Sequence, residues 1–114
     1  MNKYTGTIVE ESLDDNRLIN EFNILNTRIS GAENPADRWH LYKVDATKEQ
    51  LEELSKHIKP QKWYAHFWCD DEMIVVFRDK MFDQKVNDKN TWEPAIRYGL
   101  SHGIPIKQLD FVVE

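Results

Sequence analysis

The chain has 114 residues, 40% of them hydrophobic, and a net charge of −5. This is enough apolar material for one folded domain and too little chain for two, so we expect a single domain over residues 1–114. The acidic balance argues against general nucleic-acid binding, because proteins that hold phosphate backbones carry an excess of basic residues. No membrane contact is expected either, since the longest apolar run, Met73–Phe77, is far shorter than the roughly 20 residues of a spanning helix.

Cys69 is the only cysteine, which excludes a disulfide within the chain and a cysteine-rich zinc site. The segment Met1–Gly6 has no apolar core of the kind found in signal peptides. Together these features predict a cytoplasmic protein in a reducing compartment. Cys69 is not expected to act as a nucleophile, because a reactive thiolate needs positive neighbours and this cysteine is followed by Asp70 and Asp71.

The first half of the chain predicts three strands with a helix after the first of them. Residues 4–10 alternate loosely and contain β-branched residues, so we expect a strand there. Ser12 is then expected to cap a helix near 13–21. Residues 24–30 and 38–44 predict the second and third strands.

A capping box marks the start of the next helix. Thr47 and Gln50 have the spacing at which each side chain satisfies a main-chain N–H of the first turn. Leucines follow at helical intervals, so we expect a helix near 48–58, which Pro60 then ends.

Residues 62–86 predict a three-stranded antiparallel meander and are the most informative part of the sequence. Tight turns are expected at Asp70-Asp71 and Asp79-Lys80, where the alternation of side chains is interrupted. The expected strands are Lys62–Cys69, Met73–Phe77 and Met81–Val86.

The last helix is expected near 92–102, capped by Thr91 and carrying an apolar stripe at helical spacing. Gly103 is placed to adopt a left-handed conformation after the helix, with Ile104 as its hydrophobic contact. Residues 109–113 are a candidate final strand.

These elements predict an α+β fold. We expect an antiparallel or mixed sheet centred on residues 62–86, with two to three helices packed mainly on one face. A ferredoxin-like arrangement (βαββαβ) over residues 38–113 is one specific form of such a fold. The fold alone does not define a function.

Both faces of the meander are apolar, which a sheet with one solvated face would not need. If a two-residue loop joins its first two strands, cross-strand pairing puts Trp68 beside Met73 and His66 beside Val75. One face is expected to lie under the helices. The other face is rich in aromatic residues and must be covered by the chain itself, by a second copy of the protein or by a ligand.

The leading hypothesis is a small non-catalytic binding or interaction module, homodimeric through this aromatic face. Its candidate ligand or interface residues are His40, Tyr64, His66, Trp68, Phe77 and Phe82. No catalytic residue, metal ligand or cofactor is assigned, because the four glycines do not form a phosphate-binding loop and no nucleophile motif is present. Binding of a small-molecule ligand is a further alternative that the sequence leaves open.

The first alternative is a small enzyme or metal-binding protein that uses His40 and His66. If their strands are adjacent and in register, the two imidazoles could meet near Asp70 or Glu72 and form a metal or acid–base pair. The ordinary interpretation of each histidine is a half-buried sheet residue, because no short-range metal-binding spacing accompanies it.

The second alternative is single-stranded RNA binding through residues 56–68. In this stretch lysines neighbour aromatic residues of the kind that stack on bases. No RNA-binding motif accompanies them, and lysines at the end of a helix are ordinarily solvated.

A family resemblance rests on stretches that together span nearly the whole chain: Thr7–Leu13, Arg38–Leu41, Lys62–Phe67, Tyr98–Pro105 and Gln108–Phe111. In these stretches the chain resembles a family of small uncharacterised prokaryotic proteins. That family has no assigned activity, so the resemblance implies a prokaryotic, cytoplasmic origin and supplies no catalytic residue.

Overall fold

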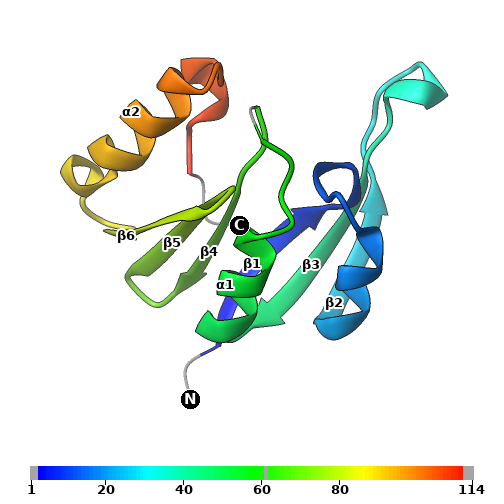
Figure 1. Ribbon diagram of the computed structural model, residues 1–114, viewed down its shortest axis with the longest axis horizontal. Helices are drawn as coiled ribbons and strands as arrows, with labels where there is room; N and C mark the ends of the chain where they lie inside the picture. The colour runs from blue at the N-terminus through cyan, green and yellow to red at the C-terminus, as the bar shows by residue number, and fades with distance from the viewer. Residues whose placement is uncertain (1–2, 61, 112–114) are drawn as a thin grey trace.

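The computed structural model of the protein describes residues 3–60 and 62–111. Its strands form one six-stranded antiparallel sheet in the order β2-β3-β1-β4-β5-β6 (Figure 1). The strands are β1 (Tyr4–Val9), β2 (Asn23–Ile29), β3 (His40–Ala46), β4 (Ala65–Cys69), β5 (Glu72–Phe77) and β6 (Lys80–Lys85). The helices are α1 (Lys48–Ser55) and α2 (Glu93–Ser101), with 3-10 helices η1 (Glu10–Ser12), η2 (Asn16–Glu21), η3 (Pro35–Asp37), η4 (Lys89–Trp92) and η5 (Ile106–Gln108). The predicted α+β class is confirmed.

The predicted meander is confirmed as β4, β5 and β6, but its second turn lies at Arg78-Asp79 and not at Asp79-Lys80, because Lys80 already pairs with Phe77. Trp68 lies opposite Met73, as a two-residue loop between β4 and β5 requires. Asp70 and Asp79, one in each turn, have φ values of 54° and 58°. Aspartate tolerates this left-handed region better than most residues, which is why both turns form without glycine.

β3 and β4 form a split β-α-β unit joined through α1. Both strands pair antiparallel with β1, which lies between them, so they run parallel to each other. A ferredoxin-like fold contains such a unit. In the ferredoxin-like arrangement predicted for residues 38–113, however, the strand between the two parallel strands would be a strand of the meander. Here the N-terminal strand takes that place, so the described strands share only the split unit with the ferredoxin-like form.

The first predicted helix starts later than expected and is a 3-10 helix. Ser12 does not cap it, because its hydroxyl donates to a carbonyl one turn back at 2.6 Å. The capping residue is Asp15, whose carboxylate accepts the N–H of Arg17. Leu13 forms an isolated β-bridge with Ile58, which keeps the chain extended there and delays the helix until η2.

The capping box predicted for α1 is confirmed. The Thr47 hydroxyl accepts the N–H of Gln50 at 3.3 Å, and the Gln50 side chain accepts the N–H of Thr47 at 2.8 Å. The helix ends at Ser55, earlier than predicted, because Ile58 is engaged in its bridge with Leu13.

The end of α2 forms the predicted left-handed stop. Gly103 has a φ of 84°. Its N–H donates to the Leu100 carbonyl at 3.2 Å, and the N–H of Ile104 donates to the Gly99 carbonyl at 3.0 Å. This pair of bonds is a Schellman motif, and Ile104 supplies its buried hydrophobic contact.

The start of α2 differs from the prediction. Thr91 does not cap the helix, because it lies in η4 and its hydroxyl donates to the carbonyl of Asp88, the N-cap residue of η4. Trp92 occupies the N-cap position instead. Residues 109–111 are not a strand, and the rest of the candidate final strand, 112–113, lies outside the described residues.

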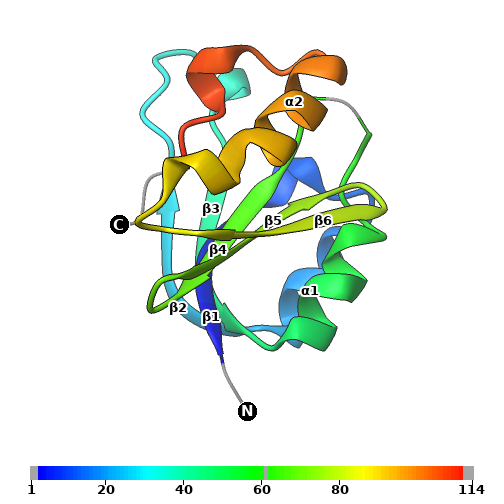
Figure 2. The same ribbon diagram turned by 90° about the vertical axis from the view of Figure 1, so that its left-hand side faces the viewer.

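The helices divide between the two faces of the sheet (Figures 1 and 2). α1, η1 and η2 pack on one face, the α1 face, where Phe67, Ile74 and Val76 are buried. α2 and residues 104–111 pack on the other, the α2 face, where Met73 and Val75 are buried. Two of the three predicted helices, found as η2 and α1, share one face, and α2 covers the other, because β5 is apolar on both sides and each side needs a cover.

No helix in the described ranges, 3–60 and 62–111, is long and apolar enough to cross a membrane.

Candidate functional site

The β5–β6 end of the aromatic face is covered by the chain itself. Phe77 is only 3% exposed, and its ring lies 4.8 Å from that of Tyr98 on α2. Phe82 is half-buried, with its ring 5.5 Å from Tyr98. Of these two candidate interface residues, Phe77 is thus a core residue under α2, and Phe82 is a partly buried residue packed against the same core.

Tyr64 holds the C-terminal segment against the sheet. Its hydroxyl donates to the main-chain carbonyl of Gln108. Its ring contacts Phe111 edge to face at 5.5 Å between centroids. Burial, with a smaller effect from the nearby Asp110 carboxylate, raises the pKa of Tyr64 to about 12. Tyr64 is therefore a neutral donor near pH 7, engaged in the fold.

A groove of about 360 Å³ lies beside this cover, and we call it the aromatic groove. Thr5 of β1 lies opposite Trp68 of β4, so Thr7 and Val9, at alternate positions along β1, share the α2 face with Trp68. The segment before β4 and the end of β2 complete the walls. The lining residues are Thr7, Val9, Arg28, Trp39, Lys62, Trp63, Tyr64, Ala65, His66, Trp68 and Gln108.

Two indole rings from distant parts of the chain meet at the groove. Trp39 precedes β3 and Trp63 precedes β4, yet their ring centroids are 5.3 Å apart at an interplanar angle of 60°. Lys62, directly before Trp63, has a φ of 62°, in the left-handed region that non-glycine residues rarely adopt. Trp39 remains 43% exposed.

The charged residues that line the groove are basic, although the chain as a whole is acidic. The chain has 20 acidic and 15 basic residues. Among the described lining residues, the two fully charged side chains are Arg28 and Lys62, and neither Asp nor Glu is present. The lining therefore combines positive charge with aromatic surface.

His66 lies in the groove within an aromatic row. Its ring is 5.8 Å from Trp68, 5.8 Å from Phe111 and 6.4 Å from Tyr64, between centroids. Three of the sequence-predicted candidates, Tyr64, His66 and Trp68, thus come together in one groove.

The condition under which His40 and His66 would meet, adjacent strands, is not fulfilled. β1 lies between their strands, so β3 and β4 are not adjacent. Leu41 pairs with Val9 on the α2 face, so the preceding His40 belongs to the α1 face, whereas His66 lies on the α2 face. Glu72, one of the carboxylates considered as a partner of the histidines, forms an ion pair with Lys85 of β6, with 3.7 Å between Oε1 and Nζ.

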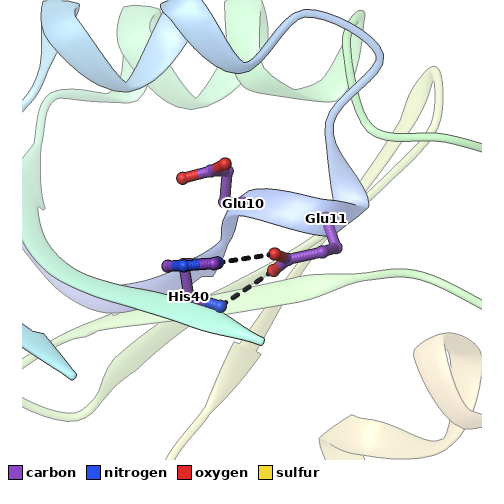
Figure 3. A group of neighbouring side chains, drawn as sticks. All are labelled: Glu10, Glu11 and His40. Carbon is purple, nitrogen blue, oxygen red and sulfur yellow. Dashed lines mark hydrogen bonds and ion pairs between the residues drawn. The ribbon is translucent and has the colours of Figure 1, made fainter. Parts of the chain in front are cut away.

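The side chains of His40, Glu10 and Glu11 lie close together, with ligand atoms within 4.8 Å of one another, and they are of the types that bind metal ions (Figure 3). Glu11 accepts both the main-chain N–H of His40 at 2.9 Å and a hydrogen bond with His40 Nδ1 at 2.8 Å. Glu10 accepts the hydroxyl of Tyr42 at 2.9 Å. These protein donors already engage both carboxylates, so the geometry is that of an ion pair between η1 and β3.

The pKa values of this pair move apart. The hydrogen bond to Glu11 is the main cause that raises the pKa of His40. Burial by itself would raise the pKa of Glu11, but the hydrogen bonds with His40 outweigh it and lower that pKa. Both shifts favour the charged pair.

The lysine and aromatic residues of 56–68 do not form one surface. Lys56 pairs with Glu53 at 3.7 Å on α1. Phe67 is fully buried in the core of the α1 face. From this stretch, Lys62, Trp63 and Trp68 reach the groove together with Tyr64, Ala65 and His66.

Sequence reasoning missed Arg28 and Trp39 as candidates. Arg28 is the single charged residue of β2, and a lone charge on an otherwise uncharged strand is a weak signal. Trp39 is a large aromatic residue just before a strand. Neither signal indicates a shared groove, because the contact depends on the placement of β2 and β3 beside β1.

Comparison with protein-family models, with curated proteins and with solved structures finds no match to this chain. The resemblance to a family of small prokaryotic proteins therefore stays a prediction.

Proposed function

We propose that the protein is a small, non-catalytic binding module whose aromatic groove takes up a flat ring that carries a carboxylate or phosphate group. The observation that carries this proposal is the lining itself, in which Trp39, Trp63 and Trp68 accompany two cationic side chains. On a protein with a net charge of −5, a site of this composition is suited to an anionic aromatic ligand.

The indole rings supply the surface for the ligand ring. Trp39 and Trp63 stand edge to face at 5.3 Å, which leaves aromatic surface toward the groove. A well-placed aromatic pair contributes about 0.5–1.5 kcal/mol beyond the area it buries. The exposed part of Trp39 is the surface that a bound ring would cover.

Lys62 and Arg28 supply the charge that selects an anion. Hydrogen bonds between a cationic side chain and a carboxylate or phosphate are roughly twice as strong as neutral ones. The two cations come from the segment before β4 and from β2. Together they would favour an anionic ring over a neutral ring of the same shape.

The size of the groove suits one small molecule. Ligand pockets in proteins are commonly about 300–1,000 Å³, and the aromatic groove has about 360 Å³. RNA-binding surfaces instead provide a series of stacking positions along a strand. We retain the cytoplasmic location expected from the sequence, since the single cysteine needs no oxidising compartment.

Tryptophan fluorescence gives a direct test. Three of the four tryptophans line the groove, so a ligand that stacks there should quench most of the emission. The protein would be titrated with a panel of aromatic carboxylates and mononucleotides, and with neutral rings of matching shape. We expect saturable quenching and a raised melting temperature with anionic rings, and weaker effects with neutral ones.

Variants identify the site. Lys62→Ala and Trp63→Ala should each weaken binding about tenfold, which corresponds to about 1.4 kcal/mol. Lys59→Ala is the matched control, because Lys59 is an exposed lysine close in sequence that does not line the groove. Equal binding of neutral and anionic rings, or a Lys62→Ala protein that binds as well as the control, would count against the proposal. Binding of oligonucleotides but not mononucleotides would favour the RNA alternative.

A further inference from the structure

β2 is an edge strand whose side chains are all exposed. It is first in the sheet order and pairs with β3, and no other strand of the described ranges pairs with its outer side. An edge strand presents main-chain N–H and C=O groups that can pair with another chain. Many proteins protect such edges with prolines and several charges. β2 has no proline, and its one charge is Arg28.

The outer edge carries exposed aliphatic residues on the α1 face. A bulge at Leu25 shifts the register, so that Ile24 lies opposite Val44 and Ile29 lies opposite His40. Both isoleucines therefore share one face, and they are 42% and 54% exposed. Thr27 lies between them on the same face, opposite Tyr42 of β3.

The other face of β2 is polar. Asn26 lies opposite Lys43, and Arg28 lies opposite Leu41. β2 is thus amphipathic although no helix of the described residues buries its apolar side. The opposite edge of the sheet differs, because β6 carries Lys80, Asp83 and Lys85.

We propose that β2 pairs antiparallel with β2 of a second copy of this chain, so that the two sheets join edge to edge. The pattern of β2 is self-complementary in one register. With Thr27 on the two-fold axis and Leu25 bulged out in both strands, Ile24 lies opposite Ile29 of the second copy. Asn26 then lies opposite Arg28 of the second copy.

This register explains the composition of the strand. Each exposed isoleucine finds an isoleucine across the interface, which is a favourable cross-strand pair. The two copies of Arg28 do not face each other, so no like charges are directly opposed. A two-fold axis makes every contact occur twice from one surface, as in most homodimers. The pairing of the two β2 strands does not require a groove ligand, but the two surfaces adjoin at Arg28, which also lines the groove.

A charge exchange at Thr27 tests the register, read out by native mass spectrometry and light scattering. Wild-type protein should show twice the single-chain mass of 13.6 kDa. Thr27→Lys alone and Thr27→Glu alone should each give monomers, because like charges then meet on the axis. An equimolar mixture of the two should recover the dimer. Asp83→Lys, an exposed change on the β6 edge, is the control and should leave the dimer intact.

A cross-link gives a second measurement that does not rely on disruption. Residues directly opposite in an antiparallel pair have Cα atoms about 4.5–5.5 Å apart, within the range of a disulfide. Thr27→Cys in a Cys69→Ser background should therefore form a covalent dimer on mild oxidation. The proposal is overturned by a wild-type protein that is monomeric at every soluble concentration. A Thr27→Lys protein that stays dimeric also overturns it. So does a dimer that is disrupted by Trp68→Glu, a change in the aromatic groove, and not by the changes in β2.

Discussion

The hydroxyl of Tyr64, just before β4, donates a hydrogen bond to the main-chain carbonyl of Gln108, 44 residues further along the chain. The Tyr64 ring also lies 5.7 Å from Phe77 and 5.5 Å from Phe111, between centroids. One residue thus links the covered part of the α2 face to the wall of the aromatic groove. The shape of the groove depends on this link, because both Tyr64 and Gln108 line it.

Tyr64→Phe tests the link. The substitution keeps the ring and removes the hydroxyl, so we expect a loss of about 1 kcal/mol in the free energy of unfolding. Urea denaturation measures this loss. Hydrogen exchange should at the same time become faster in residues 106–109 but not in β1. An unchanged stability with unchanged exchange would show that the C-terminal segment is held by its apolar contacts alone.

Gly6→Ala tests how closely β1 approaches β4. A Cβ atom at Gly6 would collide with the main-chain carbonyl oxygen of His66 and would lie 2.5 Å from the Phe67 ring. The carbonyl belongs to the sheet and cannot move away, so we expect a loss of about 3 kcal/mol or more. Gly31→Ala is the matched control, because nothing lies within 4 Å of its added Cβ, and it should change stability by less than about 0.5 kcal/mol. Equal effects of the two changes would contradict the close approach.

Gly103→Ala isolates the backbone cost of the left-handed stop after α2. No atom lies within 4 Å of an added Cβ, so the cost comes from the φ of 84° alone. We expect a loss of about 1 kcal/mol, measured by thermal or chemical denaturation. Gly103→Asn should cost less than Gly103→Ala, since asparagine tolerates this conformation better. The reverse order would show that the Schellman motif rearranges.

His40→Ala should change the pH dependence of stability. The raised pKa of His40 means that its stabilising effect is complete below the ordinary value of 6.5 and is lost as the pH rises through the folded value. The lowered pKa of Glu11 gives an effect that is lost only as the pH falls through that lowered value. The wild-type protein should therefore exceed His40→Ala in melting temperature at about pH 5.5, and the gap should narrow toward about pH 9.

Glu11→Gln is the partner variant for that experiment. It should remove most of that pH dependence, because the imidazolium then loses the carboxylate at 2.8 Å and keeps only the weaker influence of Glu10. The double variant should lose little more than either single one. A gap in melting temperature that is constant across the pH range would mean that His40 acts by packing and not by charge.

The local elements were predictable because their signals lie within a few residues of each other. The capping box of Thr47 and Gln50 and the stop at Gly103 depend on hydrogen bonds inside one helical turn. The register of β4 and β5 follows from a two-residue turn and the alternation of side chains. The predictions of Ser12 and Thr91 as caps are wrong, since competing contacts in the folded chain decide which polar residue caps a helix.

The α+β class, the meander and the apolar surface on both of its faces follow from patterns that can be seen in the amino-acid sequence. The three-dimensional fold, in contrast, inserts β1 between β3 and β4, which separates His40 from His66 and places them on opposite faces. It also brought Trp39 to Trp63 and placed α2 over Phe77. These arrangements depend on strand pairing across long stretches of chain, where many orders bury similar apolar area and no short-range pattern distinguishes them.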